Sequence, residues 1–168
     1  MNFELRLTRT LLEAIHADLS RPHPYAWERV TFLSCCASPL RADALALLGL
    51  DLHTVADEDY ERDQTVGAML GAGAFRKILQ FAYHQEVSVL HVHRHEHDGT
   101  PWFSDVDLRE ARNYVPDFWR VRPGYPHGTV VLSHDSAAGL LWIPHSPRQS
   151  RLSRISIVGM PIEEIYAP

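Results

Sequence analysis

The sequence has few cysteines, no long apolar run and no excess of basic residues. Its two cysteines, Cys35 and Cys36, are adjacent, and neighbouring cysteines rarely bridge because the disulfide would be strained. No apolar run approaches the roughly 20 residues of a membrane-spanning helix, and the N-terminal residues lack the apolar segment of a signal peptide. The formal net charge is -5, whereas nucleic-acid-binding domains are usually strongly basic. These absences predict a cytoplasmic protein that has no disulfide, does not insert into a membrane and does not bind nucleic acid.

The chain has 168 residues, of which 45% are hydrophobic. This length predicts one domain, residues 1–168, that can bury a core without disulfides. Apolar and β-branched segments predict strands over residues 28–36, 51–55, 87–95, 129–133, 139–143 and 155–159. Helical periodicity predicts helices over residues 7–19, 65–83 and 104–113, the last ending before Pro116. Residues 41–48 fit either structure, and residues 57–63 and 146–154 are predicted loops. The pattern indicates an α/β (α+β) protein with a mixed sheet flanked by helices.

The histidines are unevenly distributed, because five of the 11 lie between residues 84 and 97. Residues 87–99 read VSVLHVHRHEHDG, and their apolar start predicts a strand. Side chains alternate between the two faces of a strand, so one face here begins apolar and ends as a row of imidazoles. The members of that face are Val87, Val89, His91, His93 and His95.

Two of these imidazoles can converge on one metal ion. Positions i and i+2 of a strand lie about 6.6 Å apart, and an imidazole nitrogen binds zinc at about 2.0–2.1 Å. Asp107, in the sequence Ser104-Asp105-Val106-Asp107, is a candidate third ligand. The same Ser-x-x-Asp spacing also predicts a capping box that begins a helix. Both interpretations can hold, because a helix that starts beside the histidine strand directs its first-turn carboxylate to the same point.

A glutamate on an early strand, a His-x-His pair and a Ser-x-x-Asp group follow one another along the chain. They are Glu28, His93-Arg94-His95 and Ser104 with Asp107. In this order they resemble the JAB/MPN family, the JAMM metalloproteases, and the resemblance extends over roughly residues 25–142. It implies a mixed sheet flanked by helices, in the cytidine-deaminase-like architecture of that family.

The sequence departs from the family pattern in three places. Glu96 stands where the family usually has proline, and the loop from His95 to Ser104 is one residue longer than the commonest spacing. His91 and His97 offer alternative registers, and for the pair His95 and His97 the loop is one residue shorter than usual. We prefer His93 and His95, because the hydrophobicity of the strand ends there and prokaryotic members often carry an extra histidine two residues before the pair. His91, which has that position, is interpreted as a supporting or core residue.

The resemblance implies one zinc ion per chain, held by His93, His95 and Asp107 with a water molecule in the fourth position. Zinc suits this set of two nitrogens and one oxygen, and it can lower the pKa of a bound water to near 7. Glu28 would act as the general base on that water and then protonate the leaving amine. Ser104 would donate a hydrogen bond to the developing oxyanion.

The implied activity is that of a zinc peptidase or isopeptidase. Its substrate would be the amide or isopeptide bond after the C-terminus of a ubiquitin-like or sulfur-carrier-type protein with an extended tail. Two alternatives stay open: a non-catalytic MPN-type scaffold, whose members usually lack the metal ligands, and a zinc amidase that acts on a small-molecule amide. The partner and the oligomeric state do not follow from the sequence.

Overall fold

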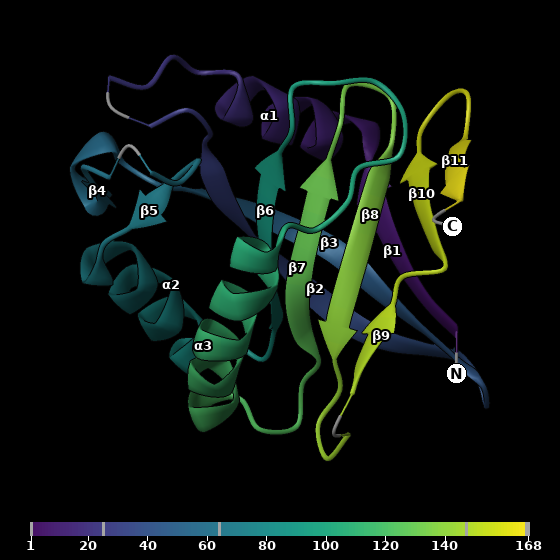
Figure 1. Ribbon diagram of the computed structural model, residues 1–168. Helices are drawn as coiled ribbons and strands as arrows, with labels where there is room; N and C mark the ends of the chain where they lie inside the picture. The colour runs from purple at the N-terminus through teal and green to yellow at the C-terminus, as the bar shows by residue number, and fades with distance from the viewer. Residues whose placement is uncertain (1, 25, 64, 147, 167–168) are drawn as a thin grey trace.

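A mixed β-sheet with helices packed on both faces makes up the protein (Figure 1). The computed structural model describes residues 2–24, 26–63, 65–146 and 148–166. Within these residues the helices are α1 (Arg9–Leu19), α2 (Ala72–His84) and α3 (Asp105–Val121), with a 3-10 turn η1 (Asp57–Asp59). The strands are β1 (Asn2–Thr8), β2 (Val30–Arg41), β3 (Ala44–Thr54), β4 (Tyr60–Glu61), β5 (Met69–Leu70), β6 (Ser88–Arg94), β7 (His127–Leu132), β8 (Ala137–Trp142), β9 (Gln149–Arg151), β10 (Arg154–Val158) and β11 (Glu163–Tyr166).

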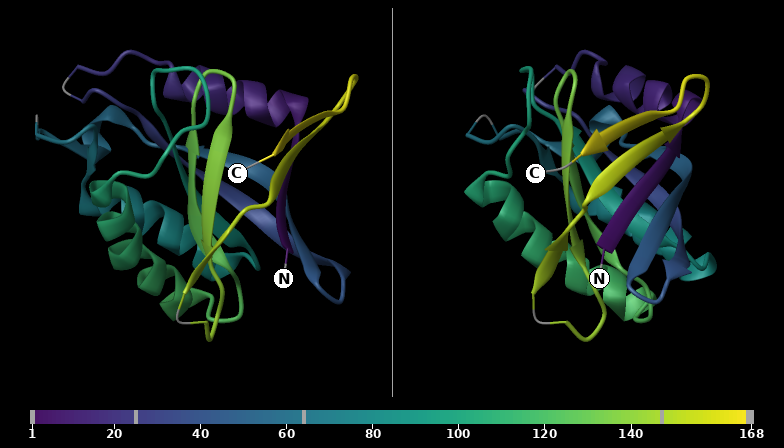
Figure 2. Two further views of the ribbon diagram at one scale, coloured as in Figure 1. Left: turned by 45° about the vertical axis from the view of Figure 1, so that its right-hand side comes forward. Right: turned by 90° about the vertical axis from the view of Figure 1, so that its right-hand side faces the viewer.

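Over the described residues, nine strands form one sheet in the order β11-β10-β1-β3-β2-β6-β7-β8-β9, and β4 pairs with β5 separately. Strand β1 pairs in parallel with β3 and β10, and β6 pairs in parallel with β7. The other pairs of the large sheet are antiparallel. The sheet curls into a half-barrel (Figure 2). An α+β protein with a mixed sheet flanked by helices was predicted, and the structure confirms this class.

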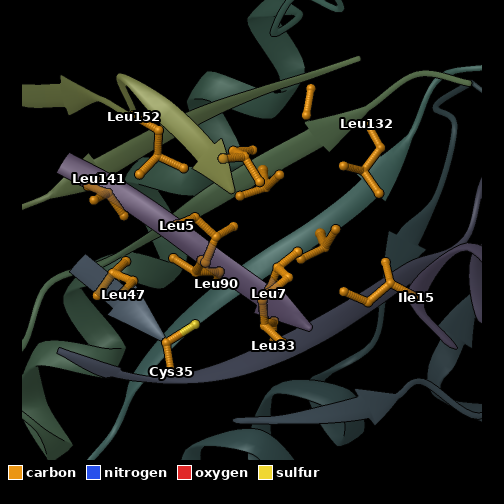
Figure 3. Close-up of a cluster of buried hydrophobic side chains, with 14 of the residues drawn as sticks. Leu5, Leu7, Ile15, Leu33, Cys35, Leu47, Leu90, Leu132, Leu141 and Leu152 are labelled. Carbon is orange, nitrogen blue, oxygen red and sulfur yellow. The ribbon is translucent and has the colours of Figure 1, made fainter. Parts of the chain in front are cut away.

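Two apolar clusters cover the opposite faces of the sheet. On one face Ile15 of α1 belongs to the same cluster as Leu33 and Leu90 of the sheet (Figure 3). On the other face Val115 of α3 belongs to the same cluster as Val89, together with residues of α2. No helix in the described part of the chain is long and apolar enough to cross a membrane.

The first predicted helix begins later than expected. Residues 2–8 form β1, so α1 starts at Arg9, where the Thr8 side chain accepts a hydrogen bond from the amide of Leu11 at 3.1 Å. The prediction from Leu7 onward was wrong there, because the backbone of β1 is paired on both sides by β3 and β10. Helical periodicity does not reveal such pairing partners.

The second predicted helix was wrong over its first part, because α2 begins only at Ala72. Residues 65–70 instead form a turn and the short strand β5. The Gly67 carbonyl accepts a hydrogen bond from the amide of Glu28 at 3.0 Å. The segment is therefore hydrogen-bonded to the residues that precede β2 and does not form a helical turn.

The third predicted helix is longer than expected. Helix α3 continues through Pro116 to Val121, although proline in a helix interior removes a hydrogen bond and costs about 3 kcal/mol. Val115 and Phe118 are each only 1% exposed. Burial of two such side chains stabilises the helix by a few kcal/mol, which offsets the proline and explains why the prediction of an end before it was wrong.

The predicted strands occur with shifted bounds. Residues 28–36, 87–95, 129–133, 139–143 and 155–159 correspond to β2, β6, β7, β8 and β10, and β2 begins two residues later, at Val30. The undecided residues 41–48 and the predicted short strand 51–55 are largely one strand, β3. The predicted loop at residues 57–63 contains η1 and β4, and the predicted loop at residues 146–154 contains β9. Strand β11 was not predicted.

Candidate metal centre

The predicted alternation of side chains along β6 is present. Val89 lies in the cluster with α2 and α3, whereas Leu90 and Val92 lie in the cluster on the face of α1. His91 and His93 therefore point to the face that α2 and α3 cover. They line a cavity there together with His95, which follows the end of β6.

Glu28 reaches the histidines through the pairing of β2 with β6. In this antiparallel pair Val30 lies opposite His93. Two residues back along the chain from Val30 is Glu28, and two residues forward from His93 is His95. Antiparallel register therefore brings the Glu28 carboxylate to the imidazoles, although about 65 residues separate them in the sequence.

One ligand atom each from Glu28, His93 and His95 lies within 4.8 Å of the others, so this group could hold a metal ion. His93 is only 2% exposed, and neither of its ring nitrogens has a hydrogen-bond partner among the described residues. A buried polar atom without a partner is costly. A metal ion at this position would give one of these nitrogens its missing interaction.

Asp107 approaches the group from the first turn of α3. One carboxylate oxygen, Oδ1, lies 3.5 Å from Nε2 of His93, which is too long for a strong hydrogen bond. Two ligands of a tetrahedral zinc ion, each at about 2.0–2.1 Å from it, are about 3.4 Å apart. These two atoms are therefore close enough together for both to bind one metal ion.

Ser104 fixes the other oxygen of the Asp107 carboxylate. The Ser104 amide and hydroxyl both donate hydrogen bonds to Oδ2 at 2.7 Å, and the Asp107 amide donates to the Ser104 hydroxyl at 3.2 Å. This is the capping box predicted for the start of the helix. It leaves Oδ1 to face His93.

The charges in the cavity favour a cation. Burial raises the pKa of Glu28; the nearby His93 opposes this shift and the Asp107 carboxylate reinforces it. Burial also acts to raise the pKa of Asp107, but interactions with His93 and Ser104 outweigh it and hold that pKa below its usual range. Burial, with the adjacent His93, lowers the pKa of His95. A neutral imidazole presents a lone pair to a metal, and two carboxylates nearby attract positive charge.

The two neighbouring histidines have different surroundings. His91 is half-buried and lines the same cavity, and desolvation there lowers its pKa to about 3. The His97 ring stacks on Trp102 at 5.0 Å, and its Nδ1 lies 2.8 Å from the carbonyl of Asp98. His97 does not line the cavity. This arrangement favours the pair His93 and His95 over the pair His95 and His97.

Glu96, at the position where the resembled family usually has proline, anchors the loop after the histidine strand. Its carboxylate accepts a hydrogen bond from Arg94 at 2.6 Å and lies 3.0 Å from the His134 ring. His134 also contacts the Asp98 carboxylate at 3.1 Å. The loop is therefore held by ionic contacts between residues that do not line the cavity.

Gly67 is a residue of the site that the sequence interpretation missed. A Cβ atom at this position would lie 2.5 Å from Oε2 and 2.6 Å from Cδ of Glu28. The Gly67 carbonyl also accepts the hydrogen bond from the Glu28 amide. The glycine therefore contacts both the backbone and the carboxylate of Glu28. The one hint of its role in the sequence was that a glycine is unfavourable within the helix predicted over residues 65–83.

No protein-family model matches this sequence, and no curated protein matches it. The resemblance to the JAB/MPN family therefore depends on the motif residues of the sequence alone.

Proposed function

We propose that the protein is a zinc-dependent peptidase or isopeptidase of the JAB/MPN type. The observation that carries the proposal is the convergence of Glu28, His93 and His95 within 4.8 Å, with Asp107 at 3.5 Å from His93, in one cavity. His93, His95 and Asp107 would hold the ion, which would activate a water molecule. The curled sheet with its helices is proposed to be the JAB/MPN architecture.

The remaining residues act on the substrate. Glu28 accepts a proton from the attacking water while the water oxygen forms a bond to the carbonyl carbon. The C–N bond then breaks, and Glu28 gives the proton to the leaving amine. The Ser104 hydroxyl donates to Asp107 in this structure, so it stabilises the oxyanion only after its hydrogen turns toward the substrate.

The proposed substrate is the amide or isopeptide bond after the extended C-terminal tail of a ubiquitin-like or sulfur-carrier-type protein. Two exposed tryptophans support a protein partner. Trp27, next to Glu28, is 79% exposed, and Trp102, in the loop before Ser104, is 65% exposed. Tryptophan is enriched at the centres of protein interfaces.

The test combines metal analysis with hydrolysis. The purified chain is expected to bind about one zinc ion and to cleave a ubiquitin-like fusion after the C-terminus of its ubiquitin-like part. A chelator should abolish cleavage and added zinc should restore it. Zinc binding without cleavage of any amide would support a scaffold, and cleavage of small amides alone would support an amidase.

Gly67→Ala is expected to lower the rate of this hydrolysis at least tenfold without unfolding the protein. The added methyl group would occupy the position of the Glu28 carboxylate, which lies at the end of a flexible side chain and can move aside. The rate and the melting temperature of the variant would be measured together. Gly124→Ala is the matched control, because a Cβ atom there meets nothing within 4 Å. An unchanged rate in Gly67→Ala would show that Glu28 does not need its present position.

A further inference from the structure

The start of β2, two residues after Glu28, is held by a tyrosine from another segment. The Tyr60 hydroxyl accepts a hydrogen bond from the Val30 amide at 2.9 Å and donates one to the Val30 carbonyl at 3.1 Å. Strand β3 ends at Thr54, opposite Thr31, which is one residue after Val30. Tyr60 therefore binds the Val30 backbone just beyond the point where the pairing of β2 with β3 ends.

The Tyr60 ring is fixed, because other side chains pack against it. Tyr60 is only 6% exposed. The His23 ring meets it edge-on with centroids 4.3 Å apart, and the Arg29 guanidinium lies 6.0 Å from the centre of the ring. Arg29 is itself buried, and its Nε donates a hydrogen bond to the Arg21 carbonyl at 2.7 Å. These contacts keep the Tyr60 hydroxyl at the Val30 backbone.

The same segment of the chain also holds the other side of Glu28. Tyr60 belongs to β4, which pairs with β5, and Gly67 lies between these two strands. The Gly67 carbonyl accepts hydrogen bonds from the amides of Trp27 and Glu28 at 2.8 and 3.0 Å. Glu28 therefore lies between two fixed backbone contacts, one at Gly67 and the other at Val30.

We propose that Tyr60 is a positioning residue for Glu28, whose carboxylate it holds near the imidazoles by fixing the start of β2. The inference rests on the proposed function. Tyr60 does not line the cavity, so it acts through the backbone and not on the substrate. Val30 lies opposite His93 in the sheet, so a shift of the Val30 backbone moves Glu28 relative to that imidazole. A displacement of about 1 Å in a catalytic group can cost about 10²-fold in rate.

Tyr60→Phe removes the hydroxyl and keeps the ring with its packing. We expect kcat to fall about tenfold or more, while KM changes less than about threefold and the zinc content stays at about one ion per chain. Ser153→Ala is the matched control. It also removes a hydroxyl that donates to a backbone carbonyl, that of Phe3 at 2.8 Å. Ser153 lies next to β10, which β1 and β3 separate from β2, so kcat should be unchanged.

A double-mutant cycle assigns the effect to Glu28. In the Glu28→Gln background, Tyr60→Phe should lower the residual rate less than about twofold, because no base is left to position. An equal loss of rate with and without Glu28 would overturn the inference. So would an unchanged kcat in Tyr60→Phe, a loss confined to KM, or a loss of zinc from that variant.

Hydrogen exchange tests the contact without depending on hydrolysis. In Tyr60→Phe the Glu28 amide should exchange about tenfold faster relative to the amide of Val89 in the central strand β6, because the start of β2 opens more often. An unchanged ratio would overturn the inference even if the chain is a zinc peptidase. If the wild-type chain cleaves no amide while the ratio rises as expected, the proposed function fails and the hold of Tyr60 on Glu28 stands.

Discussion

Glu28→Gln is expected to reduce amide hydrolysis by about 10²- to 10⁴-fold, the usual contribution of a general base, while the chain keeps its zinc. Glutamine has nearly the same shape as glutamate but cannot accept the proton of the attacking water. The carboxylate of Glu28 is half-buried in the cavity and close to His93 and His95. The measurement is kcat/KM together with the zinc content of the same sample.

The pH dependence adds a second readout for this variant. A general base works only when it is unprotonated, so activity of the wild-type chain should fall as the pH drops through the pKa of Glu28. The residual activity of Glu28→Gln should lack that acidic limb.

Glu96→Gln is the matched control for Glu28→Gln. It removes a carboxylate one residue from His95, but this carboxylate is turned toward Arg94 and His134. Its hydrolysis rate should change less than tenfold. If Glu28→Gln instead loses its zinc, Glu28 is a ligand and not the base, because one of its oxygens lies within 4.8 Å of a ring nitrogen of each histidine.

His93→Ala is expected to lower the zinc content from about one ion per chain to less than a tenth. His93 lies at the centre of the site, because it shares the group with Glu28 and His95 and also faces Asp107. Zinc at 100 times its dissociation constant should stabilise the wild-type fold by about 2.7 kcal/mol. The variant should lose that stabilisation. Metal analysis and melting curves with and without zinc measure both effects.

His97→Ala serves as the control for the choice of ligand pair. His97 stacks on Trp102 outside the cavity, so its removal should leave the zinc content unchanged. The reverse result, with zinc kept in His93→Ala and lost in His97→Ala, would assign the ligands to His95 and His97. Melting curves in the presence of a chelator would show that both variants are folded.

Local sequence patterns predicted those parts of the structure that depend on neighbouring residues. The alternation of Val89 and Leu90 between two apolar clusters follows from the period of a strand. The capping box of Ser104 and Asp107 follows from hydrogen bonds within one helical turn. Both features were predictable because the interacting groups lie within a few residues of one another.

The predicted helix bounds failed where distant contacts outweighed local preference. Burial of Val115 and Phe118 extends α3 through Pro116. Pairing with two distant strands makes residues 2–8 a strand. Both segments nevertheless carry a local pattern that fits the outcome: Phe3, Leu5 and Leu7 alternate as in a strand, and Ala111, Tyr114, Val115 and Phe118 have helical spacing.

The sequence by itself determined the α+β class of this protein, the row of imidazoles on one strand face and the carboxylate of Asp107 at a helix start. Only the tertiary structure decided that Glu28 meets His93 and His95, because this depends on the register of β2 against β6. It also decided that Gly67 packs against the glutamate and that one cavity contains Glu28, both histidines and Asp107. Such contacts join segments far apart in the chain, and strand register and helix packing set the distances between them.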